Sequence, residues 1–434
     1  MAIREISCSL IGRTCFKGCV KIKELSIPNT VEEIRDGAFM GCTSLKNISI
    51  PDNVVSIGSD AFNGCSALEK AVIGDDVTEI GAGAFYNCIQ LVEVVLGDNV
   101  RNIGYRAFAG CTDLATINFP DKLSTFDVNN STYKISETFS GCKSLTEVKL
   151  GKRVASMGSG VFLDCTGITS VDIQEGCELI GETCFANCTK LEKVDIPNTV
   201  QSIDVSAFDG CTALQSVKIG DGVTVIGAAA FYGCTKLNSL ELGSEVTTIN
   251  YRAFYGCESL QELIIPDNVR TLGVNNTTYK FSQTFANCTS LQKVTLGKKL
   301  STMGKEVFAG CPNIEVIIIR EGCSTVGDEC FEGCEKIKKI YNYCLEIPAT
   351  SNNAFSNYDA KLYVPAESLN AYKAHEVWGK FYEIMELTGE EPDGIMGVKQ
   401  SNDQNGEYYD LTGRKVQNPL RGLYIKNGKK VIVK

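Results

Sequence analysis

A four-residue phrase, Phe-x-(Gly/Asn/Asp)-Cys, recurs fourteen times along the chain. It ends at Cys19, Cys42, Cys65, Cys88, Cys111, Cys142, Cys165, Cys188, Cys211, Cys234, Cys257, Cys288, Cys311 and Cys334. Successive phrases lie 23 residues apart, except for two intervals of 31 that end at Cys142 and Cys288. A fixed period of this length predicts a solenoid, because each unit is too short to bury its apolar side except against its neighbours. A solenoid is expected to bind its ligand along an extended surface rather than in one pocket.

The composition narrows the class of protein further. The chain has 434 residues, 44% hydrophobic content and a net charge of −10, values typical of a folded domain. Residues 395–434 carry a net charge of +5, which leaves −15 on the rest. Such an acidic body argues against nucleic-acid binding, which needs a continuous basic face. No apolar run approaches the roughly 18–20 residues that cross a bilayer, so no transmembrane segment is predicted.

One unit shows what every repeat predicts. Residues 45–50 read Leu-x-x-Ile-x-Ile and alternate as a short strand does. Pro-Asp-Asn at 51–53 is typical of a turn. Residues 54–58 predict a second short extended piece that ends at glycine, and Ala-Phe-x-Gly-Cys at 61–65 predicts one helical turn.

These motifs carry a family resemblance. Leu-x-x-Ile-x-Ile is the core of a leucine-rich repeat, and Phe-x-Gly-Cys after an Ile-Gly pair resembles the BspA-like subfamily of surface proteins in bacteria and some protozoa. The repeat region spans residues 1–345. The resemblance implies an α/β-type, right-handed solenoid of 23-residue units, two of them 31 long, with a parallel sheet on its concave face. It also implies a non-enzymatic adhesin that binds host matrix or plasma proteins, such as fibronectin or fibrinogen, or other bacterial surfaces. We expect a monomer without a cofactor.

Three segments follow the repeats. Residues 346–386 are similar to the closing module of such arrays, with a helix from Ser368 to Trp378 and Ser368 as its N-cap. Residues 387–394 read as a linker. Residues 395–434 resemble the C-terminal sorting domains of proteins that Bacteroidetes export by the type IX route, and Asn427-Gly428 predicts a hairpin. The chain starts inside repeat-like sequence without a signal peptide or a capping unit, so we expect a trimmed piece of a secreted or outer-membrane-attached protein.

The two long units each carry an eight-residue insertion, at 128–135 and 274–281, which lie 146 residues apart. Extra cysteines obey the same larger period, so the array looks built by duplicating a block of about six units. Insertions that break a repeat map to loops and often bind ligands. Either the insertions make contacts or they pack over the outer wall; the residues concerned are Asn129, Asn130, Tyr133, Asn275, Asn276 and Tyr279.

The outward column of the first strand, which we call the strip, can be read directly from the sequence. It runs Ser26, Ser49, Val72, Val95, Asn118, Lys149, Asp172, Asp195, Lys218, Glu241, Ile264, Thr295, Ile318 and Tyr341. Neighbouring side chains should lie ~4.8 Å apart, which makes several of the charges opposite-sign neighbours. Either these charges satisfy one another, or the strip is a recognition surface with a polar centre and apolar ends. Glycan binding for nutrient capture is the alternative function, and it would need an aromatic platform, for which Tyr133, Tyr279 and Tyr341 are too scattered.

The 21 cysteines fit a buried thiol column, because free cysteine behaves as a small hydrophobe. A disulfide within the clusters Cys8/Cys15/Cys19, Cys177/Cys184/Cys188 and Cys323/Cys330/Cys334 stays open, whereas their spacing does not match a zinc site. His375 is the only histidine, so a Cys–His or Ser–His–Asp site could be built only there, and we expect no enzyme. A second column, Asp52, Asp75, Asp98 and Asp121, predicts turn-forming side chains, with calcium binding as the alternative.

Overall fold

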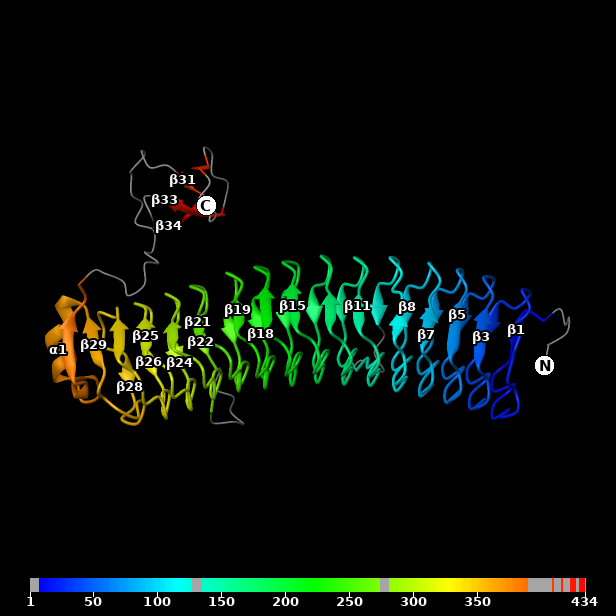
Figure 1. Cartoon of the computed structure of the whole chain (residues 1–434), viewed down its shortest axis with the longest axis horizontal. Coiled ribbons are helices and arrows are strands. Elements are labelled where there is room, and N and C mark those ends of the chain that lie inside the picture. Colours follow the sequence, from blue (N-terminus) through cyan, green and yellow to red (C-terminus); the bar gives the residue numbers. More distant parts are fainter. Residues whose placement is uncertain are drawn as a thin grey trace. The chain divides into compact units, whose positions relative to one another are not determined.

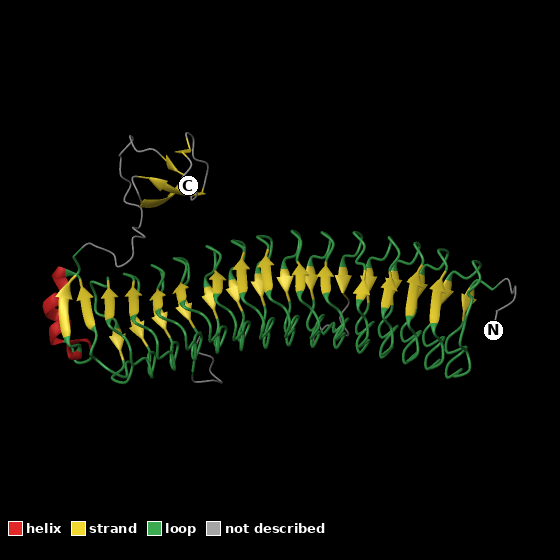
Figure 2. Ribbon diagram, viewed as in Figure 1, coloured by secondary structure: helices red, strands yellow, loops and turns green. Residues whose placement is uncertain are grey.

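The repeats fold into coils that stack side by side, as the computed structural model of the chain shows (Figure 1). The structure describes residues 8–126, 135–273 and 281–388, together with the backbone of four strands in the C-terminal segment. Two compact units divide the chain, residues 1–385 and 386–434. In the first unit each complete coil has two short strands joined by turns, and among the described residues helix occurs only at its C-terminal end (Figure 2).

The first strands of successive coils pair in parallel, and each residue faces the one a full repeat later, as Asn47 faces Lys70. Side chains alternate, so that Ile48 and Ile50 are buried while Asn47 and Ser49 are exposed. This confirms the predicted strand and its orientation; that the sheet forms a concave face stays a prediction. These strands, which we together call the first sheet, form three hydrogen-bonded groups. The first is β3 (Asn47–Ile50), β5 (Lys70–Ile73), β7 (Glu93–Val95) and β9 (Thr116–Ile117); the second is β11 (Glu147–Lys149), β13 (Ser170–Asp172), β15 (Lys193–Ile196), β17 (Ser216–Ile219) and β19 (Ser239–Glu241). The third is β21 (Glu262–Ile264), β23 (Lys293–Thr295), β25 (Val316–Ile319), β27 (Lys339–Asn342), β29 (Lys361–Val364) and β30 (Glu383–Glu386).

The second strands are shorter and also pair in parallel, with the inner residue of each pair buried, as Ile57 and Ile80 are. They confirm the predicted extended piece before the Ile-Gly pair. These strands, which we together call the second sheet, form two hydrogen-bonded groups. The first is β1 (Leu10–Ile11), β2 (Glu33–Ile34), β4 (Ser56–Ile57), β6 (Glu79–Ile80), β8 (Asn102–Ile103) and β10 (Thr125–Phe126). The second is β12 (Ser156–Met157), β14 (Leu179–Ile180), β16 (Ser202–Ile203), β18 (Val225–Ile226), β20 (Thr248–Ile249), β22 (Thr271–Leu272), β24 (Thr302–Met303), β26 (Thr325–Val326) and β28 (Ala349–Thr350).

The expected helical turn after the second strand is wrong. In the unit that ends at Cys65, Asp60 and Gly64 both have positive φ, 54° and 70°, which an α-helix does not allow. The amide of Phe62 donates to the next coil, at Ala84 O (2.7 Å), whereas the amide of Cys65 donates locally, to Phe62 O (3.1 Å). Alternate amides therefore bond between coils. The left-handed position before each cysteine explains why the phrase has Gly, Asn or Asp there.

The core is a column of phenylalanine rings flanked by the cysteines. Consecutive rings from Phe16 to Phe355 stack with centroids 5.1–5.7 Å apart. In each repeat phrase from Cys42 to Cys334, the cysteine thiol donates to the carbonyl of the phenylalanine one coil earlier, with Sγ to O distances of 3.1–3.5 Å. The cysteine column is thus buried as predicted, and it also supplies hydrogen-bond donors.

The thiols should differ sharply in reactivity. All 21 are free; Cys8 and Cys15 are exposed, Cys19 is half-buried, and the others are buried. Burial raises the pKa of Cys42 to about 11, which lowers the fraction of reactive thiolate. We expect a disulfide reagent to modify only Cys8, Cys15 and Cys19 in the native reduced chain, and all 21 cysteines in denaturant. Rapid native reaction of more than three thiols would contradict this packing.

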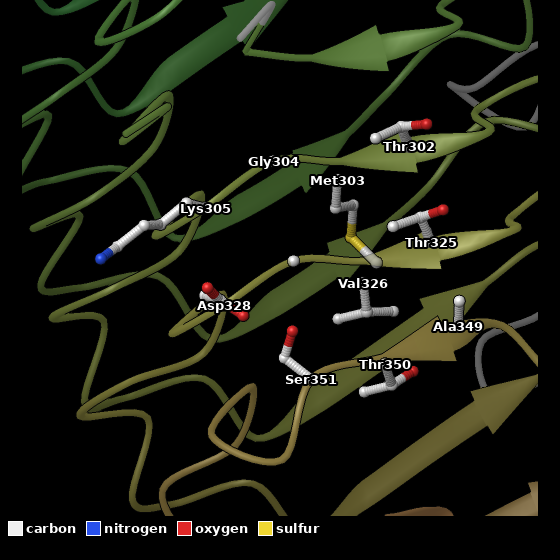
Figure 3. A pocket seen from close by; sticks show the side chains of 11 residues that line it. Thr302, Met303, Gly304, Lys305, Thr325, Val326, Asp328, Ala349, Thr350 and Ser351 are labelled. Atoms are coloured by element: carbon white, nitrogen blue, oxygen red, sulfur yellow. The ribbon is translucent and has the colours of Figure 1, made fainter. Parts of the chain in front are cut away.

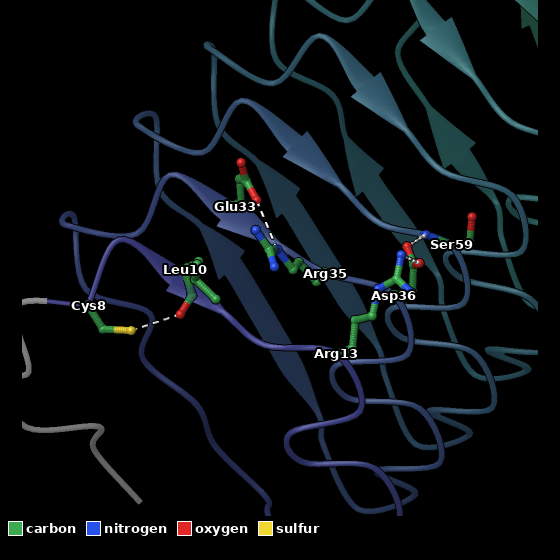
Figure 4. A network of polar contacts seen from close by, with 7 residues as sticks. All are labelled: Cys8, Leu10, Arg13, Glu33, Arg35, Asp36 and Ser59. Carbon is green, nitrogen blue, oxygen red and sulfur yellow. Dashed lines mark hydrogen bonds and ion pairs between the residues drawn. The ribbon is translucent and has the colours of Figure 1, made fainter.

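Polar contacts also join neighbouring coils, as the N-terminal end shows (Figure 4). Arg13 pairs with Asp36 at 3.1 Å, and the other carboxylate oxygen of Asp36 accepts the amide of Ser59 at 3.0 Å. In the predicted column of turn aspartates, Asp52 makes the same kind of contact between coils: its side chain accepts a hydrogen bond from the amide of Asp75 at 3.1 Å. These carboxylates therefore satisfy the backbone of the next coil rather than their own turn. No group of three His, Cys, Asp or Glu that could hold a metal occurs within the described residues.

The last coil is covered by a short helical segment. It comprises η1 (Ala366–Ser368), α1 (Leu369–Ala374) and η2 (Trp378–Lys380). Tyr372 and Trp378 are fully buried there. The predicted helix from Ser368 to Trp378 is too long, because His375 is extended and accepts the amides of Val377 and Trp378 on Nδ1 (3.2 and 3.3 Å). Ser368 precedes the helix but makes no capping hydrogen bond through its side chain.

The second unit contains an antiparallel sheet in the order β32 (Lys415–Val416), β31 (Tyr408–Tyr409), β33 (Gly422–Lys426) and β34 (Lys429–Val433). Strands β33 and β34 flank Asn427-Gly428 and pair antiparallel, with Lys426 opposite Lys429, as the hairpin prediction requires. The finer division into a cap at 346–386, a linker at 387–394 and a domain at 395–434 stays a prediction.

Candidate binding surface

The first sheet holds the centre of the strip in register. Lys149 lies opposite Asp172 on β11 and β13, and Lys218 lies between Asp195 and Glu241 on β15, β17 and β19. All five side chains are exposed. Parallel pairing places them on one face because each belongs to the same position of its coil. The structure therefore brings together the charged residues that the sequence predicts.

Most of these charges do not satisfy one another. Among the described residues, the side chains of Lys149, Asp172, Lys218 and Glu241 make no hydrogen bond or ion pair. Asp195 pairs with Lys193 of its own strand at 2.7 Å instead of with Lys218. Opposite charges are thus neighbours on the strip without being bonded to one another, and its role as a recognition surface stays a prediction.

The two ends of the strip differ from the expectation. Val72 and Val95 are half-buried and line a groove of about 340 Å³ with Asp52 and Asp75. At the other end Ile264 is 52% exposed, whereas Ile318 and Tyr341 are only 5% and 8% exposed. The ring of Tyr341 stacks on Tyr363 of the next strand at 4.6 Å. Tyr341 is therefore wrong as an exposed contact residue, because the strand that follows it covers its ring.

The predicted insertion contacts are Asn129, Asn130, Tyr133, Asn275, Asn276 and Tyr279. All six lie outside the described residues, so their role stays a prediction.

A shallow depression of about 520 Å³ lies on the second sheet across β24, β26 and β28 (Figure 3). Its floor is formed by Met303 and Val326, and Thr302 and Thr325 line it. Lys305 at its margin pairs with Glu329 at 2.9 Å. Neither this depression nor the groove beside Val72 is lined by a histidine or a cysteine, and His375 is engaged by backbone amides of the cap. Neither hollow thus contains a Cys–His or Ser–His pair.

The turn edge, formed by the segments between the second strand and each cysteine, carries a cluster that the strand-based prediction misses. Tyr232 and Tyr255 stack with centroids 4.9 Å apart and planes 5° from parallel. Arg252 lies over the ring of Tyr255 at 5.5 Å and over that of Phe281 at 4.5 Å. The sequence does hold a signal, because Tyr follows the repeat Phe in two successive coils, at 232 and 255.

A comparison with protein-family models identifies the repeats. The model described as "BspA type Leucine rich repeat region (6 copies)" matches residues 9–134, 122–228, 206–282 and 275–370. The match spans most of the chain, so this protein belongs to the BspA-type leucine-rich repeat family. That family is compatible with adhesin-like protein binding and a surface location. Its repeats generally act as non-enzymatic scaffolds.

Solved structures with the same architecture come from several bacteria. A leucine-rich repeat protein of Bacteroides ovatus is 26% identical, with a TM-score of 0.55, and the match covers 76% of this chain and 82% of that one. A leucine-rich cell surface protein of Faecalibacterium prausnitzii is 24% identical, with a TM-score of 0.40 and coverage of 77% and 91%. No curated protein matches. No helix in the described part of the chain is long and apolar enough to cross a membrane.

Proposed function

We propose that this protein is an exported, cell-surface adhesin that binds protein partners through the strip on the first sheet. The observation that carries the proposal is the row of exposed charges from Lys149 to Glu241, all of them unbonded except Asp195 and held in register by the parallel strands. Extended solenoid faces of this kind commonly bind proteins. Host matrix or plasma proteins and other bacterial surfaces are the partners that the family favours.

The C-terminal unit supports the export part of the proposal. Its four-stranded antiparallel sheet is compatible with a small sorting domain of the type IX route, which residues 395–434 resemble in sequence. In this proposal the unit directs the chain to the outer membrane, and the strip binds the partner. The insertion residues, Tyr133 and Tyr279 among them, would add contacts beside the solenoid.

A binding screen with a charge-swapped variant tests the proposal. We expect the full chain to bind immobilised fibronectin, fibrinogen or another matrix protein saturably. Exchanging the signs of Lys149, Asp172, Lys218 and Glu241 together preserves the net charge but reverses the pattern that a partner must match. We expect this variant to lose at least about tenfold in affinity, because like charges would then face each other across the interface.

A matched control exchanges Glu33 and Arg35, an exposed ion pair at 3.1 Å on the second sheet. It should leave the affinity unchanged. Undiminished binding by the strip variant would show that the contact lies elsewhere on the protein. Absence of binding to any matrix protein would contradict the adhesin proposal. Glycan capture on the strip is not favoured, because Tyr341, its one described tyrosine, is covered by its neighbour.

A further inference from the structure

The turn edge between residues 232 and 287 displays aromatic and planar polar side chains close together. Tyr232, Arg252, Tyr255 and Phe281 are each half-buried, so every one is partly fixed by packing and partly open to solvent. Asn287 donates from Nδ2 to the hydroxyl of Tyr255 at 2.6 Å. These contacts hold the cluster in place before any ligand arrives, which lowers the entropic cost of binding.

Internal duplication provides a comparison within the same chain. The 146-residue period places Tyr86, Tyr105 and Arg106 at the positions of Tyr232, Tyr251 and Arg252. The two copies then diverge on the same edge: the first copy has Ala109, Ile135, Glu137 and Gly141 where the second has Tyr255, Phe281, Gln283 and Asn287. Each of these four differences adds an aromatic ring or a planar amide to the second copy. Packing alone does not require them, since the first copy folds into the same coils.

The difference between Glu137 and Gln283 decides whether the neighbouring arginine is paired with a negative charge. In the first copy Arg106 Nε contacts Glu137 Oε2 at 2.5 Å, and this contact raises the pKa of Arg106. In the second copy Arg252 Nε donates to the neutral Oε1 of Gln283 at 2.7 Å. Gln283 in turn donates to Glu306, a carboxylate that Lys305 also contacts at 3.3 Å. Among the described residues no carboxylate therefore pairs directly with Arg252.

We propose that the cluster of Tyr232, Arg252 and Tyr255 binds a sugar that bears a single carboxylate. The guanidinium fork matches a carboxylate in shape and charge. Tyrosine rings offer apolar surface to the C–H groups of a sugar ring, and Gln283 and Asn287 supply amides for its hydroxyl groups. A polyanionic chain fits less well, because the body of the protein carries a net charge of −15 and would repel it.

Binding of 3′-sialyllactose, with lactose as the neutral counterpart, tests this proposal on the full chain. Calorimetry or ligand-observed NMR should show saturable binding of the acidic sugar to one site and none of lactose. Gln283→Glu recreates the pair found in the first copy at nearly constant volume. We expect it to weaken binding at least about tenfold, because the new carboxylate occupies the guanidinium.

Two further variants separate the site from the fold. Tyr255→Ala, which recreates the residue of the first copy, should also weaken binding, whereas Arg106→Gln alters the equivalent arginine of the first copy and should leave it unchanged. Melting temperatures of all variants show whether each one remains folded. Equal binding of lactose, unchanged affinity in folded Gln283→Glu, or no saturation at millimolar 3′-sialyllactose would each overturn the proposal. None of these outcomes bears on the strip, which uses different residues on the first sheet.

Discussion

Replacing Phe208 by alanine is expected to lower the free energy of unfolding by about 3–5 kcal/mol. Phe208 is fully buried, and its ring lies between those of Phe185 (5.3 Å) and Phe231 (5.1 Å). Alanine would remove both ring contacts and leave a cavity that the regular coils on either side cannot easily fill. Urea unfolding followed by circular dichroism measures the loss.

The Phe208→Ala substitution should also change how the chain unfolds. Stability in a solenoid is approximately a sum over coils and over the interfaces between neighbours. A weakened interface at the coil of Phe208 is therefore expected to uncouple the halves on either side and to broaden or split the unfolding transition. Phe16→Ala is the matched control, because Phe16 is half-buried and has one stacked ring, Phe39 at 5.2 Å. Equal losses from the two substitutions would contradict a continuous stacked core.

Much of the fold of the first unit was predictable because every repeat shows the same sequence pattern. The period sets the coil, the alternation at residues 45–50 sets the strand, and the apolar or small character of each cysteine position sets its burial. The helical turn was mispredicted because the alternation of bonds within and between coils depends on the carbonyls of the next coil. A single repeat, such as the one ending at Cys65, contains no sign of that neighbour.

The binding surface was only partly predictable for a related reason. Reading the strip position by position placed Lys149 and Glu241 correctly, since exposed strand positions need no partner. Exposure of Tyr341 depends on Tyr363, which lies in the irregular C-terminal segment where the period fails. The stacked pair of Tyr232 and Tyr255 could not be predicted from strand alternation or from the insertions, because it lies on the turn edge, where neither pattern indicates which side chains meet.

The second large effect is expected at alkaline pH. The pKa values of sixteen cysteine thiols are raised in the folded chain, largely because burial disfavours the thiolate, and those of Cys42, Cys177 and Cys323 reach about 11. When the pH lies above the unfolded pKa, a thiol whose pKa is higher in the folded state loses its proton on unfolding. Its contribution to stability is therefore complete below the unfolded pKa, near 8.5, and is lost as the pH rises toward the folded pKa.

The sum over these sixteen thiols makes this loss steep. Each thiol that ionises only in the unfolded chain removes about 1.4 kcal/mol per pH unit, so sixteen together remove roughly 20 kcal/mol per unit. At about 0.05–0.15 kcal/mol per residue, a first unit of 385 residues is stabilised by roughly 20–60 kcal/mol, which is comparable to the loss over a few pH units. We expect the reduced chain to remain folded to about pH 8.5 and to unfold within roughly one to three units above it. Circular dichroism and the thiolate absorbance of the buried cysteines should change together.

Two variants distinguish the buried column from the exposed thiols. Replacing Cys142, Cys188 and Cys234 by alanine removes three buried protons, so the slope of the logarithm of the unfolding constant against pH should fall by about three. Replacing Cys8, Cys15 and Cys19 by serine should leave that slope unchanged, because these thiols are exposed or half-buried. In the variant that lacks Cys8, Cys15 and Cys19, thiolate absorbance that rises near pH 9 while the circular dichroism stays native would show that the column is open to solvent. In that case, burial and hydrogen bonding would not explain why a cysteine occurs at the same position of every coil.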